Sequence, residues 1–383
     1  MTAPFTLLCR LDGRTALLSG NRLLEYYPSE PDAATMVGAV LLGRVERVLP
    51  DVKAAFVKIG QPKNGFLPLK EADSFHQAQP DRPLMSGQEI LVQVKKEPKG
   101  EKGAFLTRDI ALPGQYVLLM PRNRFVGVSK RVEDSRAQAR ARQLGRELTQ
   151  NRFGVIVRHA ALDARPGDVR EETETLWSEW QRLEESSRCR KAPCVLRRDV
   201  SAVQMLQRDY AARHELFIQQ EAEMGSQSME TAWKTANIET QLRQAVQRRV
   251  DLPEGGSLVI DEREALTTID VNSGRVVLAE KGASLPLQEN LAAVVEIARQ
   301  IRLRNLSGMV LVDFIDMETD AQRRLVQEAL AQALSDDRVK TVLHGFTSLG
   351  LMEITRKRTR ESLRELLTQP CGACCETGRV WRG

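Results

Sequence analysis

Five short β-forming runs lie between residues 40 and 110, and this spacing constrains the fold more than any other feature. Turns containing Gly and Pro separate the runs, and no long helical pattern intervenes; the runs are Val40–Val48, Ala54–Ile59, Gly65–Leu69, Glu89–Val94 and Gly103–Ile110. Five short strands in so little chain predict a small closed barrel, and the OB-fold is the architecture that fits this number of strands.

The second of these runs has one face suited to nucleic acid. Strand alternation puts Phe56 beside Lys58, whereas Ala55 and Val57 point the other way, and Phe66 begins the next strand. An aromatic ring beside a lysine suits base stacking with neutralisation of the backbone charge. The alternative is that both phenylalanines belong to the core. Further positive charge is expected in the adjoining loop, from Lys95, Lys96, Lys99 and Lys102.

The rest of the chain alternates helices and strands. Charged helical stretches are expected at 133–150 and 168–191, with a strand at 155–157 between them, and an amphipathic helix at 238–250. The last third predicts an α/β layer. Its strands are expected at 257–260, 265–271, 309–315 and 341–344, and its helices at 287–304 and 320–334.

Two strands of this α/β layer carry acids. Alternation puts Thr268, Asp270 and Asn272 on one face of the first strand, and Asp313 interrupts the apolar run at 309–315. A buried carboxylate must be paired, hydrogen-bonded or bound to a metal. Two acids on strands joined by a crossover helix predict a site for one hard divalent cation such as Mg²⁺. The alternative is that each acid caps a helix or pairs with an arginine.

Basic residues surround this predicted site in the sequence. They either form a solvated face or contact phosphodiesters. The residues are Arg299, Arg302, Arg304, Arg356, Lys357, Arg358, Arg360 and Arg364.

Near the end of the chain, Cys371 and Cys374 form a Cys-x-x-Cys pair, which is a recurrent half-site for Zn²⁺. A second chain would supply the other half of a four-thiolate shell. A redox pair, or Cys375 as a further ligand, are the alternatives.

Composition excludes several classes of protein. The chain has 383 residues and a net charge of +5, and no run approaches the roughly 20 apolar residues of a membrane span. Six scattered cysteines do not make a disulfide scaffold in a chain of this length. With no signal-peptide pattern at the N-terminus, a cytoplasmic location is expected.

Together these segments resemble the ribonuclease E / ribonuclease G family of bacterial endoribonucleases, and the stretch 355–363 is closer to the ribonuclease G branch. The segments that carry the resemblance are Leu266–Arg275, Glu296–Arg304, Gly308–Met317, Gly345–Arg358, Ala54–Val57 and Gly65–Pro68.

The resemblance implies a multidomain α/β fold. An S1-type OB domain that binds RNA (37–114) would be inserted into a ribonuclease-H-like domain, formed by residues 1–36 and 199–251. A 5′-sensor region (115–198), a DNase-I-like catalytic domain (252–366) and a zinc-link (367–383) complete the implied organisation.

The resemblance also implies roles for particular residues. The family's catalytic acids match Asp270 and Asp313 as Mg²⁺ ligands, with Asn272 orienting the reacting group. Its RNA-contacting positions in the barrel match Phe56, Phe66 and Lys102.

Three departures from the family pattern stand out. Arg158 matches the arginine of an Arg-Thr pair that holds a 5′-monophosphate, but His159 stands in place of the threonine. Cys371 and Cys374 match the zinc-link without its usual proline. The sequence stops at Gly383, before the small domain that joins family dimers into tetramers, so a homodimer through the zinc-link is expected.

The sequence therefore predicts a Mg²⁺-dependent endoribonuclease that cleaves single-stranded RNA in RNA processing and decay. Its products would carry 5′-phosphate and 3′-hydroxyl ends. One alternative is an RNA-binding or scaffolding protein that kept the fold and lost turnover, which the intact Asp270, Asn272 and Asp313 argue against. Another is a DNA nuclease, which the S1-like barrel disfavours.

Overall fold

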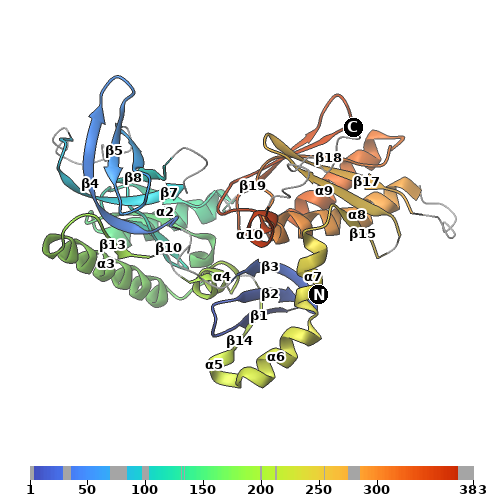
Figure 1. Cartoon of the computed structure of the whole chain (residues 1–383), viewed down its shortest axis with the longest axis horizontal. Coiled ribbons are helices and arrows are strands. Elements are labelled where there is room, and N and C mark those ends of the chain that lie inside the picture. Colours follow the sequence, from blue (N-terminus) through green and yellow to red (C-terminus); the bar gives the residue numbers. More distant parts are fainter. Residues whose placement is uncertain are drawn as a thin grey trace, which may run out of the picture. The chain divides into compact units, whose positions relative to one another are not determined.

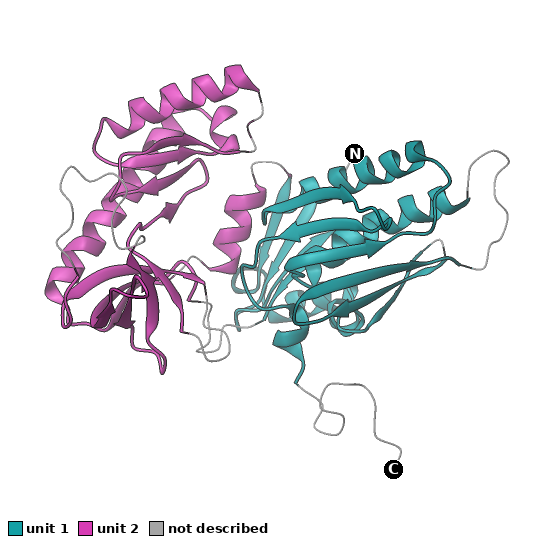
Figure 2. Cartoon of the chain, turned by 90° about the horizontal axis from the view of Figure 1, so that it is seen from above, with its two compact units in different colours: residues 1–30, 215–383 teal, residues 31–214 magenta. Residues whose placement is uncertain are grey.

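The computed structural model divides the chain into two units (Figure 2). One comprises residues 1–30 and 215–383, and the other comprises residues 31–214. The structure describes residues 4–28, 36–69, 84–96, 103–130, 132, 134–198, 201–211, 214–253, 255–274 and 285–369. Within this described part, none of the helices combines the length and the apolarity that a membrane crossing needs.

The unit at 31–214 contains the predicted barrel, whose strands run from blue to cyan in Figure 1. Its strands are β4 (Val40–Leu49), β5 (Ala54–Lys58), β6 (Gly65–Pro68), β7 (Glu89–Lys96) and β8 (Phe105–Thr107). They are ordered β4-β5-β6-β8-β7, and the pairing of β4 with β7 closes the barrel. The prediction of five strands in a closed barrel is confirmed. At Gly65, where β6 pairs with β8, a Cβ atom would overlap the buried side chain of Leu106, so a larger residue would force that side chain to move.

A second sheet lies in the same unit, with the order β11-β12-β10-β9. Helices α2 and α3 pack against it around Phe153 and Trp180, and the charged helices and the strand expected in this region are confirmed. The elements of this part are β9 (Leu112–Pro113), β10 (Val117–Met120), β11 (Val126–Val128), α2 (Ser135–Thr149), β12 (Gly154–Val157), the 3₁₀ helix η1 (His159–Leu162), α3 (Pro166–Cys189) and α4 (Ala202–Tyr210). Strand β13 (Cys194–Arg197) instead pairs antiparallel with β4 and extends the sheet of the barrel.

The other unit begins with a four-stranded sheet ordered β14-β1-β2-β3. Because β14 pairs parallel with β1, the chain returns to this sheet after the intervening 184 residues (31–214). Its core joins strand residues such as Leu8 to Trp233 of α6. The elements are β1 (Phe5–Cys9), β2 (Thr15–Ser19), β3 (Arg22–Tyr27), β14 (Leu216–Gln220), α5 (Glu221–Met224), α6 (Ser226–Thr235) and α7 (Ile238–Ala245). The helix expected at 238–250 thus ends earlier, and a strand begins at Arg249.

The last third forms a six-stranded sheet ordered β15-β16-β17-β18-β20-β19. Helices α8 and α9 bury one face of it, with Ile297 and Val326 packed among apolar strand residues. The elements are β15 (Arg249–Asp251), β16 (Ser257–Glu262), β17 (Leu266–Asn272), α8 (Leu285–Leu303), β18 (Gly308–Asp313), α9 (Asp320–Ser335), β19 (Thr341–Phe346), β20 (Met352–Arg356) and α10 (Leu363–Leu367) (Figure 1). The predicted α/β layer is confirmed.

Strand β18 differs from the fully buried strand expected at 309–315. It ends at Asp313, and its buried residues Val310 and Val312 alternate with the exposed Met309 and Asp313. Its apolar run is therefore not buried on both faces, because the helices cover only one side of the sheet. Asp313 consequently needs no buried partner, and the reasoning that placed a buried acid there was wrong.

Candidate active site and nucleic-acid interface

Asp270 and Asp313 lie side by side on the helix-free face of the six-stranded sheet. Strands β17 and β18 run parallel, and their register sets Asp270 opposite Asp313. Neighbouring strands are about 4.8 Å apart, so the two side chains leave the same face as adjacent groups. Both are exposed, while the flanking Ile269 and Val312 are buried. The structure brings together the two acids that the sequence selected.

Asn272 shares that face, as strand alternation predicts, and it contacts one of the acids. Its Nδ2 donates a hydrogen bond to Oδ2 of Asp270 at 2.8 Å. Residues Thr268, Asp270 and Asn272 are all exposed, whereas Ile269 and Val271 are buried. The amide therefore fixes the orientation of the Asp270 carboxylate without neutralising its charge.

The first turns of α8 hold the chain just after both acidic strands. The Glu289 carboxylate accepts a hydrogen bond from the N–H of Gly274, at 3.2 Å, just beyond Asn272. Asn290, fully buried, makes two hydrogen bonds with the backbone of Ile315, just beyond Asp313. The same helix turn thus positions both strand ends. Sequence reasoning missed both residues, because nothing in the sequence distinguishes them from the other polar residues of α8.

The donor set fits a hydrated divalent cation better than a closed metal cage. Among the described residues, no group of three or more His, Cys, Asp or Glu side chains is placed to hold a metal ion. Nor is Asp270 or Asp313 ion-paired with a described basic residue, although adjacent carboxylates repel unless a cation or a proton lies between them. Mg²⁺ is bound through one or two carboxylates and keeps several waters. The pair therefore fits Mg²⁺.

A basic side chain lies beside this pair. Arg248 makes two hydrogen bonds to the Asp261 carboxylate, at 2.8 and 2.6 Å. The bond to Asp261 raises the pKa of Arg248, and the nearby charge of Asp270 contributes in the same direction. The same pair lowers the pKa of Asp261. Arg248 is exposed, and its partner Asp261 lies opposite Thr268 in the register of β16 and β17.

Several arginines expected around the site instead stabilise the interior of the unit. Arg356 is 2% exposed and forms a salt bridge at 2.6 Å with Asp337, which is fully buried. Burial lowers the pKa of Arg304 to about 10, and Arg304 donates to Gln300 within α8. These residues contact protein rather than a phosphodiester, so their assignment to a basic surface was wrong.

Three further arginines contact strands β1 and β3 of the four-stranded sheet. Arg299 contacts Glu296 at 2.6 Å and the carbonyl of Leu23 at 2.9 Å. The guanidinium of Arg360 lies 3.9 Å from the ring centre of Tyr27, and burial lowers its pKa. Arg302 is also buried, beside the ring of Phe5. The exposed members of the expected basic group are Lys357, Arg358 and Arg364.

The outer face of the barrel carries a row of three aromatic rings. Phe56 pairs across the sheet with Phe66, and Phe66 pairs with Phe105. Successive ring centres are 6.0 Å apart. All three are half-buried rather than enclosed, so the alternative in which Phe56 and Phe66 belong to the core is wrong. Sequence reasoning missed Phe105, although it lies on a predicted strand beside the buried Ala104 and Leu106.

Positive charge borders this row. The Nζ of Lys96 lies 5.6 Å from the ring centre of Phe105. Lys58 and Arg47 are exposed on the neighbouring strands, and Arg47 is opposite Phe56 in the register. Lys102 lies outside the described residues. Rings that offer a π-face beside cationic side chains form a platform for single-stranded nucleic acid.

Arg158 follows strand β12 and is already engaged with protein groups. Its Nη1 donates to the Gly114 carbonyl at 2.7 Å, and its Nη2 lies 3.3 Å from Oδ1 of Asp209. Burial lowers the pKa of Arg158, while the charge of Asp209 opposes that shift. His159 begins the 3₁₀ helix and is exposed.

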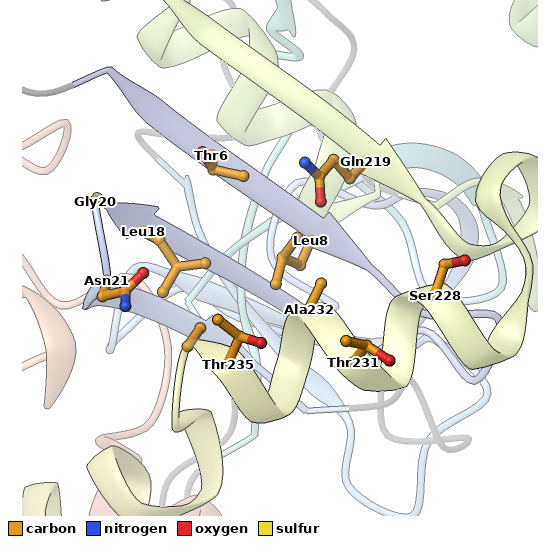
Figure 3. Close-up of a pocket in the computed structure, with 11 residues that line it drawn as sticks. Thr6, Leu8, Leu18, Gly20, Asn21, Gln219, Ser228, Thr231, Ala232 and Thr235 are labelled. Carbon is orange, nitrogen blue, oxygen red and sulfur yellow. The ribbon is translucent and has the colours of Figure 1, made fainter.

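Cys371 and Cys374 lie outside the described residues. A hollow of about 480 Å³ separates α6 from the strands of the four-stranded sheet, with Thr231 and Thr235 facing Leu8 and Leu18 (Figure 3). Among the described residues that line it, none is charged, so it has no means of neutralising a phosphate.

Comparison with known proteins agrees with this geometry. Residues 111–359 match the Ribonuclease E/G family, and residues 35–109 match the S1 RNA binding domain. Ribonuclease G of Escherichia coli (strain K12) is 34% identical over 400 residues, which cover 96% of this chain and 82% of that protein. Ribonuclease E of Nostoc sp. (strain PCC 7120) is 35% identical over 375 residues, covering 90% of this chain and 55% of that protein.

Ribonuclease G of Haemophilus influenzae, also 34% identical over 96% of this chain, gives the same result. The family match covers more than half of the chain, and the relatives align with nearly all of it. The chain belongs to the ribonuclease E/G family.

Proposed function

We propose that this endoribonuclease cleaves single-stranded RNA with Mg²⁺ held by Asp270 and Asp313, leaving 5′-phosphate and 3′-hydroxyl ends. The observation that carries the proposal is the pairing of these two exposed acids across β17 and β18. Paired carboxylates on an open sheet face leave room for a phosphodiester beside them. Membership in the ribonuclease E/G family supports RNA as the substrate.

The chain's own groups would prepare this site. The carboxylates of Asp270 and Asp313 supply two negative charges on one face, and Asn272 orients the first of them through its 2.8 Å hydrogen bond. Glu289 and Asn290 hold the two strand ends, so the acids need little reorganisation when substrate binds. When bound, Mg²⁺ would supply Lewis-acid stabilisation of the phosphoryl charge and a more acidic water.

The barrel would hold the RNA strand. Phe56 and Phe66 are proposed to stack on bases, and Lys102 to contact the backbone, in keeping with the match to the S1 RNA binding domain. Phe105 and Lys96 extend the same face. Stacking is tolerant of sequence because every base presents a π-face.

The organisation implied by the family resemblance belongs to the same proposal. The parallel pairing of β1 with β14 supports a single domain built from 1–36 and 199–251, with the S1 domain (37–114) and the 5′-sensor region (115–198) inserted. The six-stranded sheet would be the DNase-I-like catalytic domain (252–366). We propose that Cys371 and Cys374, in the link at 367–383, share one Zn²⁺ with the same residues of a second chain, giving a homodimer.

Arg158 is proposed to contact the 5′-terminal phosphate of the RNA. A guanidinium can grip a phosphate through two parallel hydrogen bonds. His159, in place of the family's threonine, removes the hydroxyl contact that would accompany it. A weak preference for 5′-monophosphorylated RNA is therefore expected.

Cleavage of one fluorescent single-stranded oligonucleotide tests the proposed activity. The RNA should be cut with Mg²⁺ and left intact with EDTA, and the products should carry 5′-phosphate and 3′-hydroxyl ends. The matched deoxy-oligonucleotide should survive. Binding without cleavage under all conditions would instead support an RNA-binding or scaffolding role, and cleavage of the DNA would overturn the assignment of the substrate.

A further inference from the structure

A carboxylate of the protein itself occupies a cluster of backbone N–H groups next to Arg158. The loop after β9 points three consecutive amides at the side chain of Glu172, which belongs to α3. The N–H of Gln115 donates to Oε1 at 2.5 Å, and the N–H groups of Tyr116 and Val117 donate to Oε2 at 2.8 and 3.1 Å. Converging amides of this kind form a concave site for an anion.

This loop touches Arg158 directly. The N–H of Arg158 donates to the carbonyl of Tyr116 at 2.8 Å, and its guanidinium donates to the carbonyl of Gly114. The charge of Glu172 acts on Arg158 as well. The amides and the guanidinium are therefore parts of one anion-binding site.

Protein carboxylates neutralise both parts. The Glu172 carboxylate accepts the hydrogen bonds of the three amides. Asp209 lies 3.3 Å from Arg158 and also forms a salt bridge with Arg208 at 3.0 Å. Asp209 is only 9% exposed, so solvent screens this pairing weakly. Two acids balance two arginines, and the site as it stands has no net charge to attract an anion.

Space for a larger group adjoins the site. A cavity of about 810 Å³ opens beside Gly114, Gln115 and Glu172. Its other charged lining residues are of both signs: Asp168, Glu171, Glu179, Arg197, Arg198 and Arg208. Ligand sites in proteins span about 300–1,000 Å³. A terminal nucleotide therefore fits next to the amides if its phosphate takes the place of the carboxylate.

We propose that Glu172 occupies the position of a terminal phosphomonoester, so that this group binds only by displacing the Glu172 carboxylate from the amides of residues 115–117. The inference rests on the proposed role of Arg158 in contacting a 5′-phosphate. It adds that the site is held closed by the chain's own acids. Competition of this kind makes the resting protein respond weakly to the 5′ end of its RNA.

The test compares Glu172→Gln with the wild-type protein. Glutamine keeps the size of the side chain but loses its charge. A terminal phosphate, which is a dianion, should therefore displace glutamine from the amides more readily than it displaces glutamate. We expect the ratio of cleavage rates for 5′-phosphorylated and 5′-hydroxyl RNA to rise about tenfold, the effect of one charge-assisted hydrogen bond. Glu185→Gln is the matched control, because Glu185 is an exposed residue of the same helix α3 and is not among the residues that line the cavity. Its ratio should stay at the wild-type value.

Two further variants separate competition from structural support. Asp209→Asn should also raise the ratio, because it frees Arg158 without touching the loop. Arg158→Gln added to Glu172→Gln should abolish the gain. An unchanged or lowered ratio in Glu172→Gln would overturn the inference, since Glu172 would then only support the loop. An equal rise in Glu185→Gln would overturn it too, because any lost negative charge on the helix would then suffice.

Binding measured without Mg²⁺ keeps the inference apart from the proposed activity. Fluorescence anisotropy measures the affinity for short 5′-phosphorylated and 5′-hydroxyl RNA. In Glu172→Gln, the preference for the 5′-phosphorylated RNA should rise about tenfold even if no cleavage occurs. Inorganic phosphate as competitor then identifies the source of the ligand. If inorganic phosphate displaces the RNA, the site binds any phosphomonoester. If phosphate does not displace it, binding at the site also requires the RNA chain. Equal binding of both RNAs by Glu172→Gln would overturn the inference.

Discussion

The side-chain amide of Asn290 is hydrogen-bonded at both ends to the backbone of Ile315. Nδ2 donates to the Ile315 carbonyl at 2.8 Å, and the Ile315 N–H donates to Oδ1 at 3.0 Å. Ile315 is two residues beyond Asp313, so a fully buried side chain on α8 fixes the chain immediately after a proposed catalytic acid.

Replacing Asn290 should therefore disturb catalysis without disturbing RNA binding. Asn290→Ala leaves an N–H and a carbonyl without partners, which should lower the free energy of unfolding by about 1–3 kcal/mol. We expect kcat to fall while KM stays near the wild-type value, because Asp313 shifts but the barrel does not. Gln288→Ala, at an exposed position of the same helix, is the control. A rise in KM with kcat unchanged would contradict this role.

The two acids themselves give the sharpest test of the site. Asp313→Asn or Asp270→Asn removes one of two paired charges and should slow cleavage roughly a thousandfold or more, while RNA affinity changes little. Rates in Mg²⁺ and binding by anisotropy measure the two effects separately. Glu328→Gln, which removes an exposed charge on α9, should cleave normally. Cleavage by Asp313→Asn at the wild-type rate would refute the assignment.

The third ring of the barrel should contribute to binding. Phe105→Ala shortens the aromatic row, and loss of one stacked base costs about 1–3 kcal/mol, or roughly 5- to 150-fold in affinity. The effect should appear in the dissociation constant for single-stranded RNA and leave kcat unchanged. Phe125→Ala removes a ring that is 48% exposed outside the barrel and serves as the comparison. Equal affinities of the two variants would remove Phe105 from the interface.

The buried pair of Arg356 and Asp337 should act on stability alone. Arg356→Ala removes the ion pair between Arg356 and the fully buried Asp337, and breaking such a pair costs about 3–5 kcal/mol. Urea unfolding should show this loss, whereas the exposed Arg358→Ala should shift stability by less than about 0.5 kcal/mol. If Arg356→Ala weakened RNA binding at unchanged stability, the buried role would be wrong.

The zinc-link predicts a fixed stoichiometry. Two thiolates per chain, from Cys371 and Cys374, complete a four-ligand site only when two chains share the ion. Elemental analysis should find one zinc for two chains, and light scattering should show that chelation or Cys374→Ser converts dimer to monomer. One zinc per chain on a monomer would refute a Zn²⁺ shared by two chains and would indicate Cys375 as an additional ligand.

Local patterns were sufficient to predict the parts of the site that lie along single strands. Alternation alone put Asp270 and Asn272 on one face of β17, and it put Phe56 outside and Val57 inside the barrel. These predictions hold because the direction of a side chain from a strand depends only on its position in the chain. The pairing of Asp270 with Asp313 was expected from two strands joined by a helix.

Tertiary packing decided which charges are on the surface. Arg304 and Arg356 both stand among basic residues in the sequence, yet both are buried. Arg356 meets Asp337 from another segment, whereas Arg304 donates to Gln300 one helical turn earlier. Asp313, in contrast, lies in an apolar run and is exposed, since helices cover only one face of its sheet.

The same reason explains the groups that the sequence did not indicate. Phe105 joins Phe66 only through the pairing of β8 with β6, and Asn290 reaches Ile315 only because α8 packs across the strand ends. Glu172 meets its three amides across 55 to 57 residues of chain. The sequence by itself determined the strands, their faces and the acids they carry. The tertiary structure alone decided which distant groups neutralise, support or compete with them, because hydrogen bonds and ion pairs depend on distances of a few ångströms that the fold creates.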